Sequence, residues 1–345
     1  MLFKKNKVFF IAELSSNHNK KIKNAKKLMF DAKKSGADLI KIQTYLPSSI
    51  TLNSNNKFFK INKGTWKGKS LWQIYDDAKT PLSWHQELFA YAKKINITLF
   101  SSPFCEFTVD FLESVGCPLY KIASSELTHI PLIKKIALTK KPIIMSTGMA
   151  NLDEIKIAYE TAQKNGCTDI SLLYCVSNYP STTNDFNMYN IIKMKNIFNC
   201  KVGFSDHCKS DIASFAAVAN GATIIEKHIC LDRQTTSPDI TFSMKVGKLR
   251  NFIKNINEIF DMSKNKIFKI SKSENFSRKY RRSIFVSENI RKGDLFTENN
   301  LKVVRPANGV SPKYFFKIMN KKSPRALRKN LPLKKIILSE LKIKQ

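Results

Sequence analysis

Short apolar runs of the kind that form buried strands alternate with amphipathic stretches through most of the chain, and this alternation restricts the possible folds most strongly. The strand-like runs cover residues 8–13, 39–43, 98–102, 119–123, 143–147, 170–175, 202–205 and 222–228. Between most of them, apolar side chains recur at three- and four-residue spacing, which predicts helices over residues 24–35, 85–94, 109–115, 132–139, 153–164 and 211–219. Eight strands alternating with helices predict a closed α/β barrel of the TIM type. A doubly wound open sheet is the alternative, but no Gly-x-Gly-x-x-Gly turn supports it.

The remaining segments predict an insert, a linker and a second domain. Residues 53–80 fall in the long gap between the second and third strand-like runs, and they indicate an inserted active-site loop with Trp66 and Trp72. Residues 248–260 predict one more helix, and the polar, lysine-rich segment after it predicts a linker. We therefore expect a barrel domain over residues 1–262, a linker over 263–279 and a small domain over 280–345.

The composition narrows the classes of function. The net charge is +32, but few of the 59 basic residues are arginines and the lysines are spread along the whole chain. We therefore expect a field that attracts an anionic substrate, and no nucleic-acid partner. No apolar run reaches transmembrane length, and the N-terminus lacks the cleavage pattern of a signal peptide, so we expect no membrane partner. Seven cysteines without a Cys-x-x-Cys pair argue against a disulfide framework, and we expect a cytoplasmic protein.

Two of the five histidines end strand-like runs in matching positions. His207 closes the run that contains Ser205, and His228 closes the run that contains Glu226. Parallel strands of a barrel deliver catalytic groups from these ends, so the two imidazoles are a candidate metal pair. Two ordinary solvated histidines are the alternative explanation.

The other predicted strands end in polar and ionisable side chains as well. Two lysines and several hydroxyls at one mouth of the barrel indicate a site for a phosphate and a carboxylate. Two carboxylates there could polarise or protonate a substrate oxygen. The strand-end residues include Glu13, Lys41, Gln43, Ser102, Lys121, Ser124, Glu126, Ser146, Ser177, Tyr179 and Ser205.

The order of these motifs resembles the sialic acid synthase family, whose members condense phosphoenolpyruvate with an amino-sugar to make nine-carbon α-keto acids. The motifs are AELSSNHN at 12–19, KIQTY at 41–45, YKIASSE at 120–126, STGM at 146–149, SDH at 205–207 and IEKH at 225–228. In the last stretch, RRS at 281–283, KGD at 292–294 and RPANGVSP at 305–312 resemble the antifreeze-like (SAF) domain of the family. The resemblance covers nearly the whole chain and implies a TIM barrel followed by a SAF domain.

The resemblance also implies roles for residues that match the family's motifs. Phosphoenolpyruvate would be held by Lys41, Ser102, Lys121, Ser124, Ser146 and Ser205, with Ser177 standing where the family often has asparagine. His207 and His228 would bind a divalent metal ion, Mn²⁺ or Mg²⁺. The sugar would contact Gln43, Tyr179, Asp239 and Arg305. Because Arg305 belongs to the SAF domain, its role implies a domain-swapped homodimer in which each SAF domain caps the partner's barrel.

The same resemblance implies the reaction. The metal ion polarises the aldehyde of the open-chain sugar, C3 of phosphoenolpyruvate attacks it, and Glu13 or Glu126 handles the proton on the new hydroxyl. Water then adds at C2 and phosphate leaves with C–O cleavage. Residues 13–18, 58–66, 76–85 and 101–104 look most like the pseudaminic acid synthase branch, which uses a diacetamido-trideoxy-altrose.

Other functions stay open on the sequence alone. Trp66 and Phe59 would give the apolar pocket that a deoxygenated sugar needs, unless these aromatics only pack the inserted loop. The other functions are an N-acetylneuraminate or legionaminate synthase, or a non-catalytic protein that binds carbohydrate or nucleic acid. The set of Glu13, two lysines and two histidines argues against the non-catalytic function, because binding alone does not need it.

Overall fold

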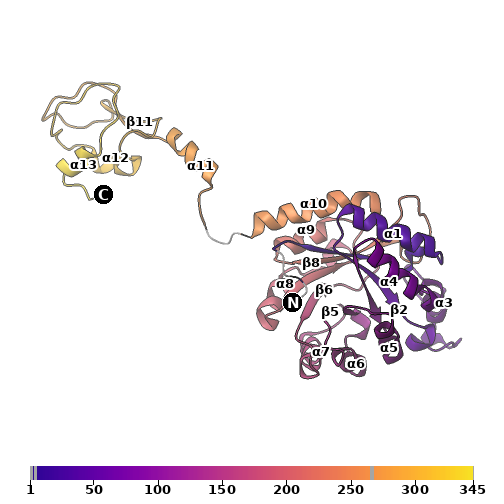
Figure 1. Cartoon of the computed structure of the whole chain (residues 1–345). Coiled ribbons are helices and arrows are strands. Elements are labelled where there is room, and N and C mark those ends of the chain that lie inside the picture. The colour runs from indigo at the N-terminus through magenta and orange to yellow at the C-terminus, as the bar shows by residue number, and fades with distance from the viewer. Residues whose placement is uncertain (1–2, 4–5, 265–267, 345) are drawn as a thin grey trace. The chain divides into compact units, whose positions relative to one another are not determined.

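Eight parallel strands form a closed barrel in the first part of the chain. The computed structural model describes residues 3, 6–264 and 268–344. Each strand pairs in parallel with the next, and β1 pairs with β8, which closes the sheet and confirms the TIM-type barrel (Figure 1). The strands are β1 (Phe9–Glu13), β2 (Leu39–Thr44), β3 (Thr98–Pro103), β4 (Tyr120–Ile122), β5 (Ile143–Ser146), β6 (Ile170–Cys175), β7 (Lys201–Asp206) and β8 (Ile224–Cys230).

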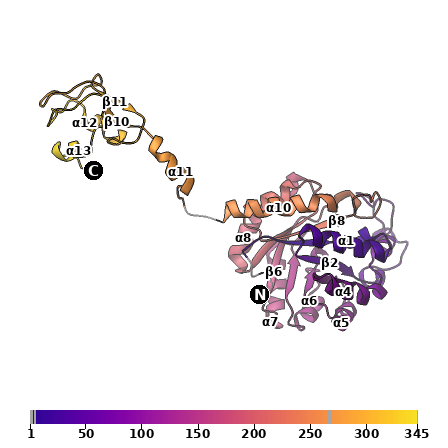
Figure 2. The same ribbon diagram turned by 45° about the horizontal axis from the view of Figure 1, so that its top comes forward.

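Helices surround the barrel, as the two views in Figures 1 and 2 show. They are α1 (Ile22–Ser35), α4 (His85–Lys94), α5 (Glu106–Ser114), α6 (Ile130–Ala137), α7 (Leu152–Lys164), α8 (Tyr189–Phe198), α9 (Ile212–Ala219) and α10 (Val246–Ser263). Six of these and α10 agree with the expected helices to within a few residues. The helix α8 was not predicted, although its buried Ile191, Met194 and Phe198 have helical spacing.

The insert between β2 and β3 is more ordered than the predicted loop. After α2 (Pro47–Ile50), residues 53–80 contain a short 3₁₀ turn (Lys57–Phe59) and α3 (Leu71–Ala78). The helix begins with a capping box, in which the Ser70 hydroxyl accepts from the Gln73 amide at 3.2 Å and Gln73 Oε1 accepts from the Ser70 amide at 2.9 Å. Reciprocal capping of this kind fixes a helix start.

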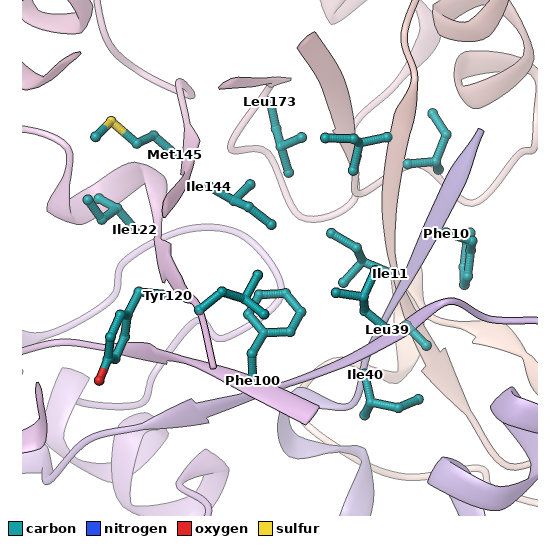
Figure 3. Packing of buried hydrophobic residues seen from close by; sticks show 14 of the residues in the cluster. Phe10, Ile11, Leu39, Ile40, Phe100, Tyr120, Ile122, Ile144, Met145 and Leu173 are labelled. Atoms are coloured by element: carbon teal, nitrogen blue, oxygen red, sulfur yellow. The ribbon is translucent and has the colours of Figure 1, made fainter. Parts of the chain in front are cut away.

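Alternation along the strands places a polar layer directly on an apolar one. Figure 3 shows Ile11, Leu39, Phe100 and Ile144 packed together as buried side chains inside the barrel. Successive side chains of a strand point to opposite faces, so the residue two positions further along shares the same face. The inward positions above this apolar layer are therefore Glu13, Lys41, Ser102 and Ser146. The apolar layer excludes water from below and leaves the polar layer at the carboxyl ends of the strands.

The second compact unit of the chain has its own small core. The first unit spans residues 1–265 and the second spans residues 266–345. The second unit contains α11 (Lys272–Ser277), the antiparallel pair β10 (Ser283–Val286) and β11 (Leu301–Val304), α12 (Phe315–Ile318) and α13 (Ile336–Glu340). Ile284, Phe296 and Ile337 are among its fully buried residues. The expected linker over 263–279 thus contains the helix α11, and the expected limits of the domains stay a prediction. Within the described ranges, no helix is both long and apolar enough to cross a membrane.

Candidate active site

Two buried lysines and two buried glutamates meet at the centre of the barrel. Lys41 Nζ lies 2.9 Å from Glu13 Oε2 and 3.2 Å from Glu226 Oε1. Lys121 Nζ lies 3.3 Å from the same Glu226 oxygen. All four residues are at most 4% exposed. Charged groups interact strongly at such buried positions, where the dielectric constant is low. Removing the lysines or the glutamates would leave the opposite charges buried without partners.

The two glutamates of this cluster differ in their protonation. Burial raises the pKa of Glu13 to about 6, although Lys41 opposes the effect. Burial also disfavours the Glu226 carboxylate, but Lys121 and Lys41 outweigh it and hold the pKa of Glu226 at about 2. Glu226 is therefore ionised at neutral pH and pairs with both lysines, whereas Glu13 can exchange a proton near neutral pH.

Several serine side chains lie at the strand ends with this cluster. Ser102 Oγ lies 3.5 Å from Lys41 Nζ, and Ser205 Oγ donates to Glu226 Oε1 at 3.1 Å. Ser124 Oγ accepts from the Gly148 amide at 3.0 Å. Ser146 Oγ and Glu226 Oε2 are buried without a hydrogen-bond partner among the described residues. A buried polar atom left unpaired costs about 1–3 kcal/mol, so these two unpaired atoms indicate that a polar ligand completes the site.

The two candidate metal-binding histidines lie side by side at the ends of β7 and β8. Their ring centroids are 5.5 Å apart. His207 Nδ1 lies 3.2 Å from the Val176 carbonyl, which leaves Nε2 as the lone-pair nitrogen. Burial lowers the pKa of His228 well below its ordinary value, so this ring is neutral, as a metal ligand must be. His228 Nδ1 is buried without a hydrogen-bond partner in the described chain and lies 3.7 Å from Asp239 Oδ2.

These histidines fit a divalent cation with open coordination positions. Among the described residues, no group of three or more His, Cys, Asp or Glu side chains is arranged to hold a metal ion. Two imidazoles alone would leave the other positions to substrate and water, which is what a Lewis-acid site needs.

A cavity of about 300 Å³ opens above this polar layer. Its polar lining includes Gln43, Tyr179, His228 and Asp239. Asp239 is held by Ser16, whose hydroxyl donates to Oδ2 at 2.8 Å. The wall on the side of the insert is mostly apolar and consists of Ile61, Trp66, Leu71, Ile74, Tyr75 and Ala78. The cavity thus joins a polar floor to an apolar wall.

The insert is attached to the barrel mouth at two points. Trp66 Nε1 donates to the Pro238 carbonyl at 3.1 Å, and Thr65 Oγ1 donates to the Tyr179 carbonyl at 2.7 Å. The Trp66 and Tyr179 rings also lie 5.8 Å apart. Of the two aromatics expected in the apolar wall, Trp66 lines the cavity, whereas Phe59 is not among the described residues that line it.

The second candidate acid, Glu126, is separate from the cluster of Glu13. Its Oε2 accepts from the Ser125 hydroxyl at 2.7 Å, and it does not belong to the cavity lining among the residues described. Burial raises the pKa of Glu126 to about 7. Glu13 is likewise outside the described cavity lining, and each glutamate accepts from a residue that belongs to it, Glu13 from Gln43 and Glu126 from Ser125. What distinguishes Glu13 is its contact with Lys41 of the buried cluster.

This acid predicts a pH-dependent stability difference. Below about pH 4.5 Glu126 is protonated in both the folded and the unfolded chain; as the pH rises, the unfolded chain ionises first, and stability falls until about pH 7. At about 1.4 kcal/mol per pH unit, the gap between 4.5 and about 7 amounts to about 3–4 kcal/mol. Glu126→Gln should therefore gain stability relative to the wild type over this interval. Urea unfolding across the pH range measures the difference, and parallel curves for the two proteins would contradict it.

Gly148 leaves room for the hydroxyls of the site. A Cβ added at this residue would lie 2.3 Å from Ser177 Oγ and 2.8 Å from Ser124 Oγ. Gly148→Ala should therefore displace both hydroxyls and raise the KM for the expected anionic substrate by about tenfold or more, the effect of about 1.4 kcal/mol of lost binding. Steady-state kinetics test this. Gly221→Ala is the control, since its Cβ meets nothing within 4 Å and its strained φ of +95° affects stability only; equal KM values for Gly148→Ala and the wild type would contradict the prediction.

Arg305 belongs to the second unit, just after β11, and its side chain is exposed. Its expected contact with the sugar therefore stays a prediction, as do the roles assigned to the other site residues.

Glu226 is not among the residues that the sequence predicts for the site, although it belongs to the IEKH motif at 225–228. Glu226 stands two positions before His228 on β8, so strand alternation places both on the inner face. This two-residue spacing is the feature of the sequence that could have identified Glu226 as a site residue. Asp206 and Lys227 have the opposite parity, and the structure pairs them behind the strands.

The comparisons with known proteins agree with this geometry. Residues 28–268 match the NeuB family, and residues 281–335 match the SAF domain. The chain therefore belongs to the NeuB family, which confirms the expected kinship with sialic acid synthases and the SAF domain at the C-terminus. At the level of the family, it is an enzyme of the synthase type.

Particular relatives are similar over nearly the full length. A pseudaminic acid synthase of Helicobacter pylori is 40% identical over 94% of this chain and 95% of its own. An N,N'-diacetyllegionaminic acid synthase of Campylobacter jejuni is 38% identical over 91% of this chain and 95% of its own. The crystal structure of an N-acetylneuraminic acid synthetase from Leptospira borgpetersenii, 28% identical, matches with a TM-score of 0.70 over 79% of this chain and 90% of that one.

Proposed function

We propose that this enzyme condenses phosphoenolpyruvate with a diacetamido-trideoxy-altrose to give the nine-carbon α-keto acid pseudaminic acid and phosphate. The observation that carries the proposal is the buried cluster of Lys41, Lys121, Glu13 and Glu226 below a cavity with an apolar wall. The similarity to pseudaminic acid synthases supports the choice of sugar. We place the reaction in the cytoplasm, where phosphoenolpyruvate is made.

The lysines and hydroxyls would bind the anionic ends of phosphoenolpyruvate. Lys41 and Lys121 supply the charge, and Ser102, Ser124, Ser146, Ser177 and Ser205 supply hydrogen bonds. The preorganised cations also stabilise the charge that phosphate carries away when the C2–O bond breaks. Because Glu226 fixes both lysines, little reorganisation is needed when the substrate arrives.

Glu13 would supply the proton for the new hydroxyl. The arriving anion raises the pKa of Glu13 further above about 6, so the acid enters the reaction protonated. When C3 of phosphoenolpyruvate attacks the aldehyde carbon, Glu13 gives its proton to the aldehyde oxygen. Water then adds to the cationic C2, its proton returns to the carboxylate, and phosphate departs.

We further propose that His207 and His228 hold a divalent metal ion, Mn²⁺ or Mg²⁺, at the floor of the cavity. Bound there, the ion would supply Lewis-acid polarisation of the sugar's aldehyde oxygen. The unpaired Nδ1 of His228 and the neutral state of its ring support this assignment.

The apolar wall would select the sugar. A trideoxy sugar presents a methyl group where N-acetylmannosamine has a hydroxymethyl group, and Trp66, Ile61 and Ile74 offer apolar surface to it. A buried site that cannot hydrogen-bond a hydroxyl discriminates against it by about 1–3 kcal/mol.

Phosphate release from phosphoenolpyruvate with Mn²⁺ tests the choice of sugar. We expect the highest kcat/KM with the altrose derivative, and lower values with N-acetylmannosamine and the legionaminate precursor. Trp66→Ala should reduce the preference over N-acetylmannosamine by about tenfold, the loss of about 1.4 kcal/mol of apolar contact, because it removes the wall and its bond to Pro238. Trp72→Ala, in the same insert but outside the described lining, is the matched control. If the enzyme preferred the legionaminate precursor, the proposed sugar substrate would be wrong, and the proposed condensation with phosphoenolpyruvate would still hold.

We also propose that Arg305 reaches the sugar across a domain-swapped homodimer. The support is the resemblance of residues 305–312 to the family's motif and the exposure of Arg305 in a separate unit. Mixing inactive Arg305→Ala and His207→Ala subunits tests it. Recovery of turnover after subunit exchange supports the swap, and no recovery in verified mixed dimers argues against it.

A further inference from the structure

A buried ion pair lies directly behind the two histidines. Asp206 and Lys227 are partners in the β7–β8 register, and each precedes a candidate metal ligand, His207 or His228. Their side chains point away from the barrel interior, because neighbouring strand residues face opposite sides. Lys227 Nζ lies 2.7 Å from Asp206 Oδ2, and the two residues are 1% and 0% exposed.

Further hydrogen bonds connect this pair to the backbone around His207. Asp206 Oδ1 accepts from the Cys208 amide at 2.7 Å, and Lys227 Nζ donates to the Cys208 carbonyl at 2.6 Å. Ser214 of α9 donates to Asp206 Oδ2 at 2.6 Å. The residues on both sides of His207 are therefore tied to the residue before His228 and to the helix that covers these strands.

Stability alone does not explain such a pair. Removing two charges from water costs several kcal/mol each, and well-packed apolar residues of similar size often stabilise a protein as much or more. The inner face of the same two strands carries the imidazoles, whose rings are 5.5 Å apart. We infer that Asp206, Lys227 and Ser214 are positioning residues that hold His207 and His228 at the separation needed to share one cation. This inference rests on the proposed metal site.

The experiment removes the pair without leaving an unpaired charge. The double variant Asp206→Leu/Lys227→Met keeps an apolar filling behind the strands and should fold. Leu132→Ala, at a buried position of α6, is the control for general destabilisation, since a buried leucine truncated to alanine costs about 2–5 kcal/mol. Calorimetry with Mn²⁺ should show at least about tenfold weaker binding to the double variant than to the wild type and the control, as for other partners that orient metal ligands.

A second measurement keeps the inference testable if the wild type binds no Mn²⁺. The chain has 5 histidines, so histidine-labelled protein gives few NMR signals. In the double variant, the signals of His207 and His228 should shift and broaden in the absence of metal, and those of the other histidines should not. The positioning role would be overturned if the double variant bound Mn²⁺ as tightly as the wild type does, or if its His207 and His228 signals were unchanged. It would also be overturned if Leu132→Ala changed the Mn²⁺ affinity and these signals as much as the double variant does. Absence of Mn²⁺ binding to the wild type, with these signals shifted in the double variant, would instead overturn the metal assignment alone.

Discussion

Lys41→Met should abolish phosphate release and lower the free energy of unfolding by about 3–5 kcal/mol at neutral pH, the cost of breaking one buried ion pair. Lys41 contacts both Glu13 and Glu226, so its loss leaves Glu13 without its nearest cation. The pKa of Glu13, already raised to about 6 by burial, should rise further. Urea unfolding measures the loss of stability, and a phosphate-release assay with phosphoenolpyruvate and the sugar measures the loss of turnover.

The sign of the pH dependence makes this prediction sharper. When the pKa of a carboxyl group is higher in the folded protein than in the unfolded chain, the free energy of unfolding falls as the pH rises from the unfolded pKa to the folded one. The part of the destabilisation by Lys41→Met that comes from Glu13 should therefore be small below about pH 6, where Glu13 is protonated in both folded proteins, and grow above it. Lys164→Met, which breaks the exposed pair with Glu160, should change stability by less than about 1 kcal/mol. If the two variants behaved alike, the buried cluster would not have the charges described.

His207→Ala should also abolish turnover, with the fold retained. The expected loss is at least about a thousandfold in kcat, because the reaction would lose the polarisation of the aldehyde. Mn²⁺ should raise the melting temperature of the wild type and not of the variant, since a ligand stabilises only the state that binds it. Circular dichroism checks that the variant folds. Near-normal activity, or an unchanged response to Mn²⁺, would contradict the metal assignment.

His129→Ala is the matched control for this variant. His129 caps α6, where its Nδ1 accepts from the Leu132 amide at 3.0 Å, and it lies away from the cavity lining that the structure describes. Losing a cap should cost about 1 kcal/mol of stability and leave the Mn²⁺ response in place.

The barrel could be predicted because its signals are local. Each strand is a short apolar run, and most helices have regular apolar spacing, so sequence alone indicated eight strands and their ends. The helix α3 in the insert begins instead at the Ser70–Gln73 capping box. The sequence did not indicate this helix, because the composition of the insert is typical of a loop. The helix α8 was missed although Ile191, Met194 and Phe198 were spaced as in the other helices.

The site could be predicted only in part because its charges are compensated across strands. Lys41 and Lys121 stood out as strand-end cations, but their shared partner Glu226 comes from the opposite part of the sequence. Strand parity separates Glu226 from Lys227, yet only the packed structure shows that Lys227 pairs with Asp206 behind the histidines. Glu13 and Glu126 were equivalent candidates in the sequence. Their environments distinguish them, since Glu13 lies against Lys41 whereas Glu126 is bonded to Ser125.

Phosphoenolpyruvate labelled with heavy oxygen in the C2–O–P bridge tests the central claim most directly. The enzyme is incubated with this substrate, Mn²⁺ and the altrose sugar, and the products are analysed by mass spectrometry. Condensation with C–O cleavage predicts that the released phosphate keeps the heavy oxygen and that a nine-carbon α-keto acid appears in equal amount. Light phosphate, or phosphate released without the α-keto acid, would contradict the proposed reaction.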